Sequence, residues 1–382
     1  MPLLLRRLAR LVFLAACMAA LAGCGSIHRG YESYLVLDDL QSQGASSRLQ
    51  ATTAAPERTP VGYTMDGRTH VADVYRPADR APRATLVLIH GFTEEGRRDP
   101  RLVAFANSMA RLGFVVIAPD VEGPRTLSVS MDDARTIRDS VAYALRDPDD
   151  LAEPPVGLMA FSFAVGPAII AATRPAVADE LRFVVAVGGY YDLDKAITYV
   201  TTGLDPYSGE RRAMTDARRQ ARWVVLRSQL DRLDRAGDRE RLRAIAERRL
   251  ESPGADVSAL RAGLSADGRA VYALVTNTDP ERVPELLEAL PADVRATIEA
   301  LDLARRDLSR LQARLVLIHG TQDRVIPIGH SRQLQAAVGD DQAHLYPASG
   351  LYHVEVSPGL YSGWQLWRAG YRILTLADDN GD

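Results

Sequence analysis

Six short apolar segments constrain the fold of this 382-residue chain more than any other feature. Apolar runs of this length, bounded by turn residues, are typical of parallel strands that are buried on both faces of a sheet. Helical patterns such as 102–112 and 132–145 alternate with them, so the sequence predicts an α/β fold with a mostly parallel, doubly wound sheet. The apolar segments are 85–89, 114–118, 156–160, 183–187, 315–318 and 343–346.

Two further strands are expected ahead of this series. The stretches 63–65 and 70–75 flank Asp66-Gly67, a dipeptide that strongly favours a two-residue hairpin turn. We therefore expect the folded core to begin near residue 60 with an antiparallel hairpin.

The alternation of strands and helices stops between residues 194 and 313. Connections in compact domains usually have about 2–6 residues, so a gap of this length indicates an inserted domain. Apolar residues recur at three- and four-residue spacing in 211–235 and 284–303, which predicts helices. The expected organisation is a core formed by 60–193 and 314–382, with a helical insertion at 194–313.

The N-terminal sequence is typical of a secretory signal. Residues 1–10 contain three arginines and no acid, and an apolar run follows at 11–22, shorter than the roughly 20 residues that span a bilayer. Leu21-Ala22-Gly23-Cys24 resembles the lipobox of bacterial lipoproteins, which implies a signal peptide at 1–23 and lipidation of Cys24. A plain cleaved signal with an incidental cysteine is the alternative.

Residues 24–59 are mostly small and polar, so we expect a tether between the anchor and the core, although 34–37 is apolar enough to dock. Gly25, rather than aspartate, follows the cysteine. By the same resemblance, the expected location is the cell envelope, at the outer membrane facing the periplasm if the organism is Gram-negative.

The formal net charge of the chain is −3, so the sequence lacks the excess of basic residues that nucleic-acid-binding proteins have. Nucleic acid is therefore not expected as a partner.

Ser162 is the candidate nucleophile. It follows the apolar segment 156–160 and precedes a helical pattern at 165–172, as in the strand-to-helix turn called a nucleophile elbow. That turn needs small residues two positions before and after the serine, and these are Ala160 and Ala164. A buried serine that caps the helix is the alternative.

A serine hydroxyl becomes a good nucleophile only when an oriented histidine accepts its proton. Asp323 lies in the loop after 315–318 and His353 in the loop after 343–346. Both are expected at the carboxyl edge of the sheet, where open α/β sheets bind their ligands. Asp192, after 183–187, is a rival for the acid. The histidines expected to have surface, packing or loop-fixing roles are His28, His70, His90, His319, His330 and His344.

The oxyanion of an acyl-transfer reaction needs preorganised amide donors. The amide of Phe163 directly follows the serine. The second donor should come from the loop after 85–89, where Gly91 permits a tight turn and Phe92 is preferred over Thr93.

Taken together, these elements resemble the α/β-hydrolase superfamily, of the dienelactone hydrolase and serine-esterase kind, over 61–192 and 313–372. The matching elements are the His90-Gly91 loop, the Pro119-Asp120 turn with Gly123, the serine elbow, the Gly320-Thr321-Gln322-Asp323 loop and the late His353, in the family's order of Ser, Asp and His. Ala160 and Ala164 depart from the glycines that are common in the family.

The resemblance implies a serine hydrolase that cleaves a carboxylic ester or thioester of a small-molecule acyl substrate, without cofactor or metal. The helical insertion would then form a cap over the pocket. A serine peptidase is an alternative, since Glu94 and Glu95 could hold a substrate amine, and so is an acyltransferase. A binding lipoprotein that kept the fold without activity is a further alternative, because fold alone does not establish function.

Overall fold

The structure is a computed structural model that describes residues 25–42, 46–146, 155–353, 355–356 and 360–378. The predicted signal peptide and Cys24 lie outside these ranges. Eight strands form one sheet in the order β1-β2-β4-β3-β5-β6-β7-β8. The first two form the expected hairpin and β2 pairs antiparallel with β4, whereas all other neighbours are parallel. The strands are β1 (Glu57–Met65), β2 (Arg68–Arg76), β3 (Ala84–Ile89), β4 (Phe114–Pro119), β5 (Val156–Phe161), β6 (Leu181–Val187), β7 (Arg314–Gly320) and β8 (Ala343–Ala348).

The six apolar segments of the sequence coincide with β3 to β8, which confirms the predicted doubly wound sheet. Every residue of β3 and β4 is buried, as expected for parallel strands covered on both faces. In β5, a Cβ added at Gly157 would lie only 2.2 Å from Cζ of the Phe183 ring, so the packing of this ring requires glycine at this position. The chain has the α/β-hydrolase fold.

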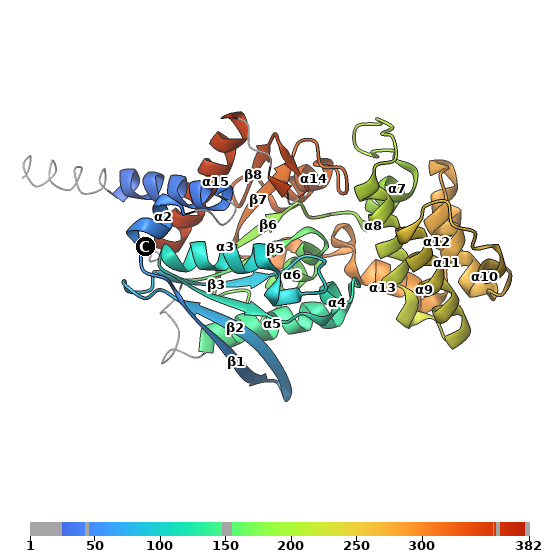
Figure 1. Ribbon diagram of the computed structural model, residues 1–382, viewed down its shortest axis with the longest axis horizontal. Helices are drawn as coiled ribbons and strands as arrows, with labels where there is room; N and C mark the ends of the chain where they lie inside the picture. Colours follow the sequence, from blue (N-terminus) through green and yellow to red (C-terminus); the bar gives the residue numbers. More distant parts are fainter. Residues whose placement is uncertain (1–24, 43–45, 147–154, 354, 357–359, 379–382) are drawn as a thin grey trace, which may run out of the picture.

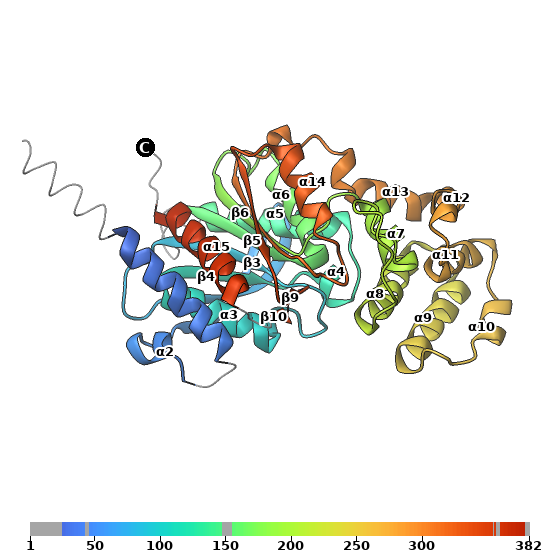
Figure 2. The ribbon, with the colours of Figure 1, turned by 90° about the horizontal axis from the view of Figure 1, so that it is seen from above.

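Helices cover both faces of the sheet (Figures 1 and 2). On one face, α3 (Pro100–Arg111) and α15 (Leu360–Asp378) share a hydrophobic core with β3, β4 and β6. On the other face, α5 (Met131–Arg146), α6 (Val165–Ala172) and α14 (Gly329–Val338) contribute to a second core, which continues into the helices between β6 and β7. Shorter elements are α2 (Arg48–Thr52), α4 (Glu122–Arg125) and the pair β9 (Leu351–Tyr352) and β10 (Glu355–Val356).

Seven helices lie between β6 and β7 among the described residues, and they gather at one end of the molecule (Figure 1). We refer to them as the cap. Within 211–235, where one helical pattern was predicted, α8 ends at Arg227 and a 3-10 turn follows at Leu230–Arg232. The cap helices are α7 (Leu193–Thr202), α8 (Asp216–Arg227), α9 (Ala236–Glu251), α10 (Ser258–Ala262), α11 (Ala266–Thr276), α12 (Val283–Glu288) and α13 (Ala292–Leu301).

The prediction of a tether over 24–59 is wrong. Residues 25–41 form a helix, which we call the N-terminal helix, and α2 follows before β1 begins at Glu57. Leu35, Val36 and Leu49 are buried in the same core as α3 and α15. The small polar composition was misleading, because small residues also let helices pack closely. The ring of Trp367 on α15 lies where a Cβ at Gly30 would approach it to 3.1 Å.

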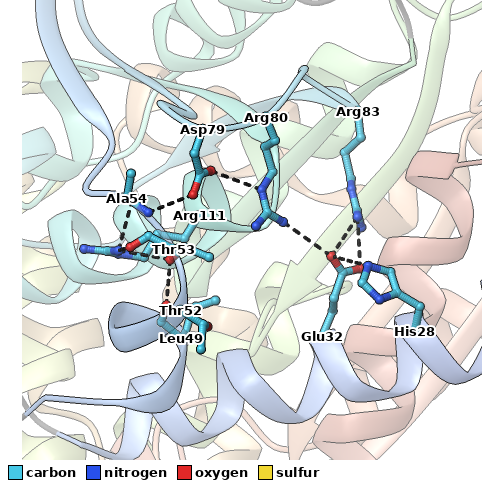
Figure 3. A network of polar contacts seen from close by, with 10 residues as sticks. All are labelled: His28, Glu32, Leu49, Thr52, Thr53, Ala54, Asp79, Arg80, Arg83 and Arg111. Carbon is cyan, nitrogen blue, oxygen red and sulfur yellow. Dashed lines mark hydrogen bonds and ion pairs between the residues drawn. The ribbon is translucent and has the colours of Figure 1, made fainter.

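An ion cluster around the buried carboxylate of Glu32 also holds the N-terminal helix (Figure 3). The carboxylate of Glu32, which is almost fully buried, accepts two hydrogen bonds of 2.9 Å from Arg83 and lies 3.7 Å from Arg80. His28 lies 3.3 Å from the same carboxylate. Because the carboxylate of Glu32 is buried, loss of both arginine partners would leave an uncompensated charge, which typically costs about 3–5 kcal/mol. The helix is therefore a fixed part of the fold.

Candidate active site

Ser162 lies in the sharp turn between β5 and α6. Its φ angle is 57°, in the left-handed region that side-chain-bearing residues rarely adopt. A strained backbone of this kind persists only where the surrounding structure enforces it, and here Ala160 and Ala164 are fully buried on either side. The turn thus holds the serine at the carboxyl edge of the central strand.

Three side chains from separate loops form a hydrogen-bonded chain at this edge. Ser162 Oγ lies 2.7 Å from His353 Nε2, and His353 Nδ1 lies 2.9 Å from Asp323 Oδ2. Because a carboxylate can only accept, Nδ1 carries the proton and Nε2 is left to accept from the serine hydroxyl. The structure therefore brings together all three residues selected from the sequence.

Asp323 is buried and held from two sides. Its Oδ1 accepts hydrogen bonds from the backbone amides of Val325 and Ile326, at 2.8 and 2.9 Å. Burial alone would raise the pKa of Asp323, but the nearby His353 and His319, together with the amide of Ile326, hold that pKa below its usual value. The carboxylate is thus ionised and faces His353 in a fixed orientation.

The rival acid, Asp192, has a different role. Its side chain accepts a hydrogen bond from the amide of Lys195 at 2.9 Å, which makes it the N-cap of α7. It also forms an ion pair of 2.7 Å with the ammonium group of Lys195. These contacts use both carboxylate oxygens to start the first cap helix.

Two other histidines fix loops around the site. His319, fully buried, has Nε2 at 2.8 Å from the carbonyl oxygen of Ile326 and at 3.5 Å from Asp323 Oδ2. Its Nδ1 lies 2.7 Å from the hydroxyl of Ser331. His90 accepts a hydrogen bond of 3.4 Å from the amide of Val121 and so ties the end of β3 to the end of β4. Burial lowers the pKa of both imidazoles, which keeps them neutral.

The loop after β3 approaches Ser162 closely. A Cβ placed on Gly91 would lie 3.8 Å from the Cβ of Ser162, so the backbone passes directly beside the serine. The amide of Thr93 donates to the carbonyl of Pro124 at 3.3 Å, so it is already engaged. This contact favours Phe92, the donor preferred from the sequence, over Thr93. The rings of Phe92 and Phe163 stack with their centroids 5.3 Å apart.

A small cavity of about 40 Å³ lies between these two rings and the cap. Its walls are mostly apolar, and none of the residues lining it is charged. The cap residues that line this cavity cannot be recognised from the sequence. Residues that pack in a helical core and residues that line a pocket recur at the same helical spacing. The lining is formed by Phe92, Val129, Phe163, Tyr190, Leu193, Ile197, Val224, Val225, Ser228, Gln229, Thr297, Ile298 and Leu301.

His330 packs between the core and the cap. Its Nδ1 lies 3.3 Å from the amide of Tyr191 and 3.4 Å from the hydroxyl of Tyr207, and among the described residues its Nε2 has no partner. Burial, with a smaller contribution from His319, lowers the pKa of His330 to about 3. The imidazole is thus neutral in the folded chain and accepts through Nδ1.

This burial predicts an acid-sensitive stability. An unfolded histidine has a pKa of about 6.5. Below that pH, His330 is protonated in the unfolded chain but stays neutral in the folded chain. The free energy of unfolding therefore falls as the pH falls. Between pH 7 and 5, we expect His330 to contribute about 2 kcal/mol to this loss. Denaturant unfolding of the parent and of His330→Gln at both pH values measures it. An equal pH dependence in the two proteins would show that His330 is not the cause.

No known protein-family profile matches this sequence. Among solved structures, the chain is similar to acylaminoacyl peptidase from Pyrococcus horikoshii, with a TM-score of 0.48 and 12% identity over 85% of this chain and 41% of that one. A puromycin-hydrolyzing peptidase of Mycobacterium tuberculosis matches with a TM-score of 0.46 and 15% identity, over 84% of this chain and 39% of that one. The chain thus spans about two fifths of the length of these two peptidases.

The dienelactone hydrolase of Anabaena variabilis is matched over nearly its whole length. The TM-score is 0.41 and the identity 14%, over 84% of this chain and 99% of that one. Likeness at these levels identifies neither an activity nor a substrate for this chain.

The described residues contain neither a metal-binding cluster nor a helix that could span a membrane. No group of three or more histidine, cysteine, aspartate or glutamate side chains is arranged to hold a metal ion within the described ranges. None of the helices described has both the length and the apolar character needed to cross a bilayer.

Proposed function

We propose that this chain is a serine hydrolase that cleaves a carboxylic ester or thioester through an acyl-enzyme intermediate. The observation that carries the proposal is the hydrogen-bonded chain from Ser162 through His353 to Asp323, with the serine held at positive φ. A serine that merely capped α6 would need neither the histidine nor the strained turn. The two features together are those of an activated nucleophile.

In the proposed reaction, Ser162 Oγ attacks the acyl carbon while its proton moves to His353 Nε2. Asp323 stabilises the imidazolium that forms, and the amides of Phe92 and Phe163 donate to the oxyanion. The imidazolium then protonates the departing alcohol or thiol. In the second half, His353 takes a proton from water, the hydroxide adds to the acyl carbon, and the carboxylic acid is released as Ser162 regains its proton.

The cavity, which is lined by Phe163 next to the serine, favours an uncharged acyl group. Its lining is mostly apolar and includes Phe92 and, from the cap, Ile197 and Val225. Its volume of about 40 Å³ is far below the roughly 300–1,000 Å³ of pockets that enclose small-molecule ligands. We therefore infer that the cap helices move away from the core to admit a substrate.

The peptidase alternative gains less support from the structure. Glu94 and Glu95 are exposed, and the carboxylate of Glu95 accepts a hydrogen bond of 2.5 Å from the hydroxyl of Thr93. The residues that line the cavity include no acid that could hold a substrate amine. An acyltransferase would use the same acyl-enzyme and differ only in replacing water with another alcohol.

The same proposal places the chain in the cell envelope, with a lipid on Cys24. The support is the sequence alone: three arginines, an apolar run and the small residues before the cysteine. Gly25 favours the outer membrane, facing the periplasm, in a Gram-negative organism.

A substrate panel tests the hydrolase assignment. We expect the purified protein in detergent to hydrolyse p-nitrophenyl esters of graded acyl length and the matching thioesters, and to leave aminoacyl p-nitroanilides intact. Ester bonds are intrinsically easier to cleave, so each rate is compared with the uncatalysed rate of the same compound. Preferential acceleration of the anilides would establish a peptidase, and no acceleration of any acyl compound would favour a binding protein.

A further inference from the structure

The N-terminal helix exposes a row of large apolar and aromatic side chains. Ile27, Tyr31 and Tyr34 have exposed fractions of 76%, 51% and 39%. Spacings of four and three residues put them on one face of the helix. On the opposite side of the helix, Glu32, Ser33 and Val36 are buried.

Aromatic side chains continue this row onto α15, which lies beside the N-terminal helix (Figure 2). Trp367 donates a hydrogen bond of 2.7 Å to the carbonyl of Gly30. Trp364 stacks on Trp367 with ring centroids 5.0 Å apart and is 54% exposed. Seven large hydrophobic side chains are exposed in the described part of the chain, and five belong to these two helices: Ile27, Tyr31, Tyr34, Leu40 and Trp364.

The sequence places the proposed anchor next to this row. Cys24 directly precedes the first described residue of the N-terminal helix, and Ile27 is three residues further on. Three residues of extended chain reach only about 10 Å, so a lipid on Cys24 would hold the first turn of the helix at the bilayer surface. The ion cluster around Glu32 keeps the helix docked on the core, so the exposed row cannot turn away independently.

We propose that Ile27, Tyr31, Tyr34 and Trp364 form a membrane-contacting face that inserts into the headgroup region of the bilayer. The proposal rests on the lipid anchor at Cys24 and is independent of the hydrolase activity. Tyrosine and tryptophan favour this depth because they present an apolar ring and a polar edge to the two sides of the interface.

A cationic group lies at the same surface. The guanidinium of Arg48 lies over the ring of Tyr34, 5.8 Å from its centroid. Arginine near a bilayer surface is attracted to anionic headgroups, by about 1 kcal/mol each.

Quenching of tryptophan fluorescence by brominated phospholipids tests the proposal on the mature lipidated protein in vesicles. The chain has three tryptophans, and Trp223 is buried in the cap. We expect brominated vesicles to quench the parent relative to unbrominated vesicles, Trp364→Phe to lose most of this quenching, and the matched Trp223→Phe to retain it. Equal fluorescence of the parent in the two kinds of vesicle would overturn the proposal.

A second variant removes the face without touching either tryptophan. Replacing Ile27, Tyr31 and Tyr34 together with serine should reduce the quenching while leaving ester hydrolysis in detergent unchanged. Failure of the hydrolase proposal would instead appear as an inactive parent with normal quenching. Unchanged quenching in the triple variant, or concentration-dependent self-association of the parent in detergent that the triple variant loses, would assign the face to something other than lipid.

Discussion

Replacing Ser162 with alanine should lower kcat for ester hydrolysis by about 10⁴- to 10⁶-fold and abolish covalent labelling by a fluorophosphonate probe. The hydroxyl that this substitution removes lies 2.7 Å from His353 Nε2. Among the described residues, no other side chain is hydrogen-bonded to this nitrogen. Any remaining acceleration would come from the oxyanion donors and from binding. The measurement is single-turnover and steady-state hydrolysis, with labelling read by mass spectrometry.

The matched control is Ser258→Ala, at the exposed start of a cap helix. It removes a serine hydroxyl far from the hydrogen-bonded chain and should keep both the rate and the labelling of the parent. Undiminished labelling of Ser162→Ala would refute the nucleophile. A parent that neither reacts with the probe nor hydrolyses esters would shift the assignment to a binding protein.

Replacing Asp323 with asparagine should lower kcat by about 10⁴-fold with little loss of folding. The amides of Val325 and Ile326 hold Oδ1, so the asparagine oxygen is expected to stay there. Its NH₂ group then faces His353 Nδ1 and can only donate to it. The imidazole must therefore carry its proton on Nε2, where it can no longer accept from Ser162.

Asp192→Asn is the matched control, because asparagine is an equally good N-cap for α7. It loses the ion pair with Lys195, which is partly exposed and contributes little. We expect the activity of this variant to stay within a few-fold of the parent. Rates are compared at equal folded fractions, which circular dichroism provides. A large loss in Asp192→Asn with none in Asp323→Asn would reverse the assignment of the acid.

Much of the site could be predicted because parallel strands have a strong sequence signature. A strand covered on both faces by helices is apolar throughout, and the residues after such strands all meet at one edge of the sheet. Ser162, Asp323 and His353 each follow a run of this kind, so their proximity in the fold could be expected without coordinates.

The N-terminal region shows where composition fails. Residues 24–59 have the small polar character of a linker, yet Glu32 pairs with Arg83, 51 positions later, and Gly30 packs on Trp367. Neither partner can be recognised from local sequence. For the cap, the sequence predicts helices but not which of their residues line the cavity. Packing positions and pocket-lining positions have the same helical periodicity.

By itself, the sequence determined the order of strands and helices, the strand-to-helix turn at Ser162 and the set of polar residues at the carboxyl edge, since these depend on local patterns of burial and on chain direction. Only the tertiary structure decided which acid faces His353, which loop amide pairs with Pro124 and where the N-terminal segment docks. Those outcomes depend on contacts of a few ångströms between residues far apart in the chain. Asp192 and Asp323 both follow strands, but one caps α7 and the other is held by the amides of its own loop against the histidine.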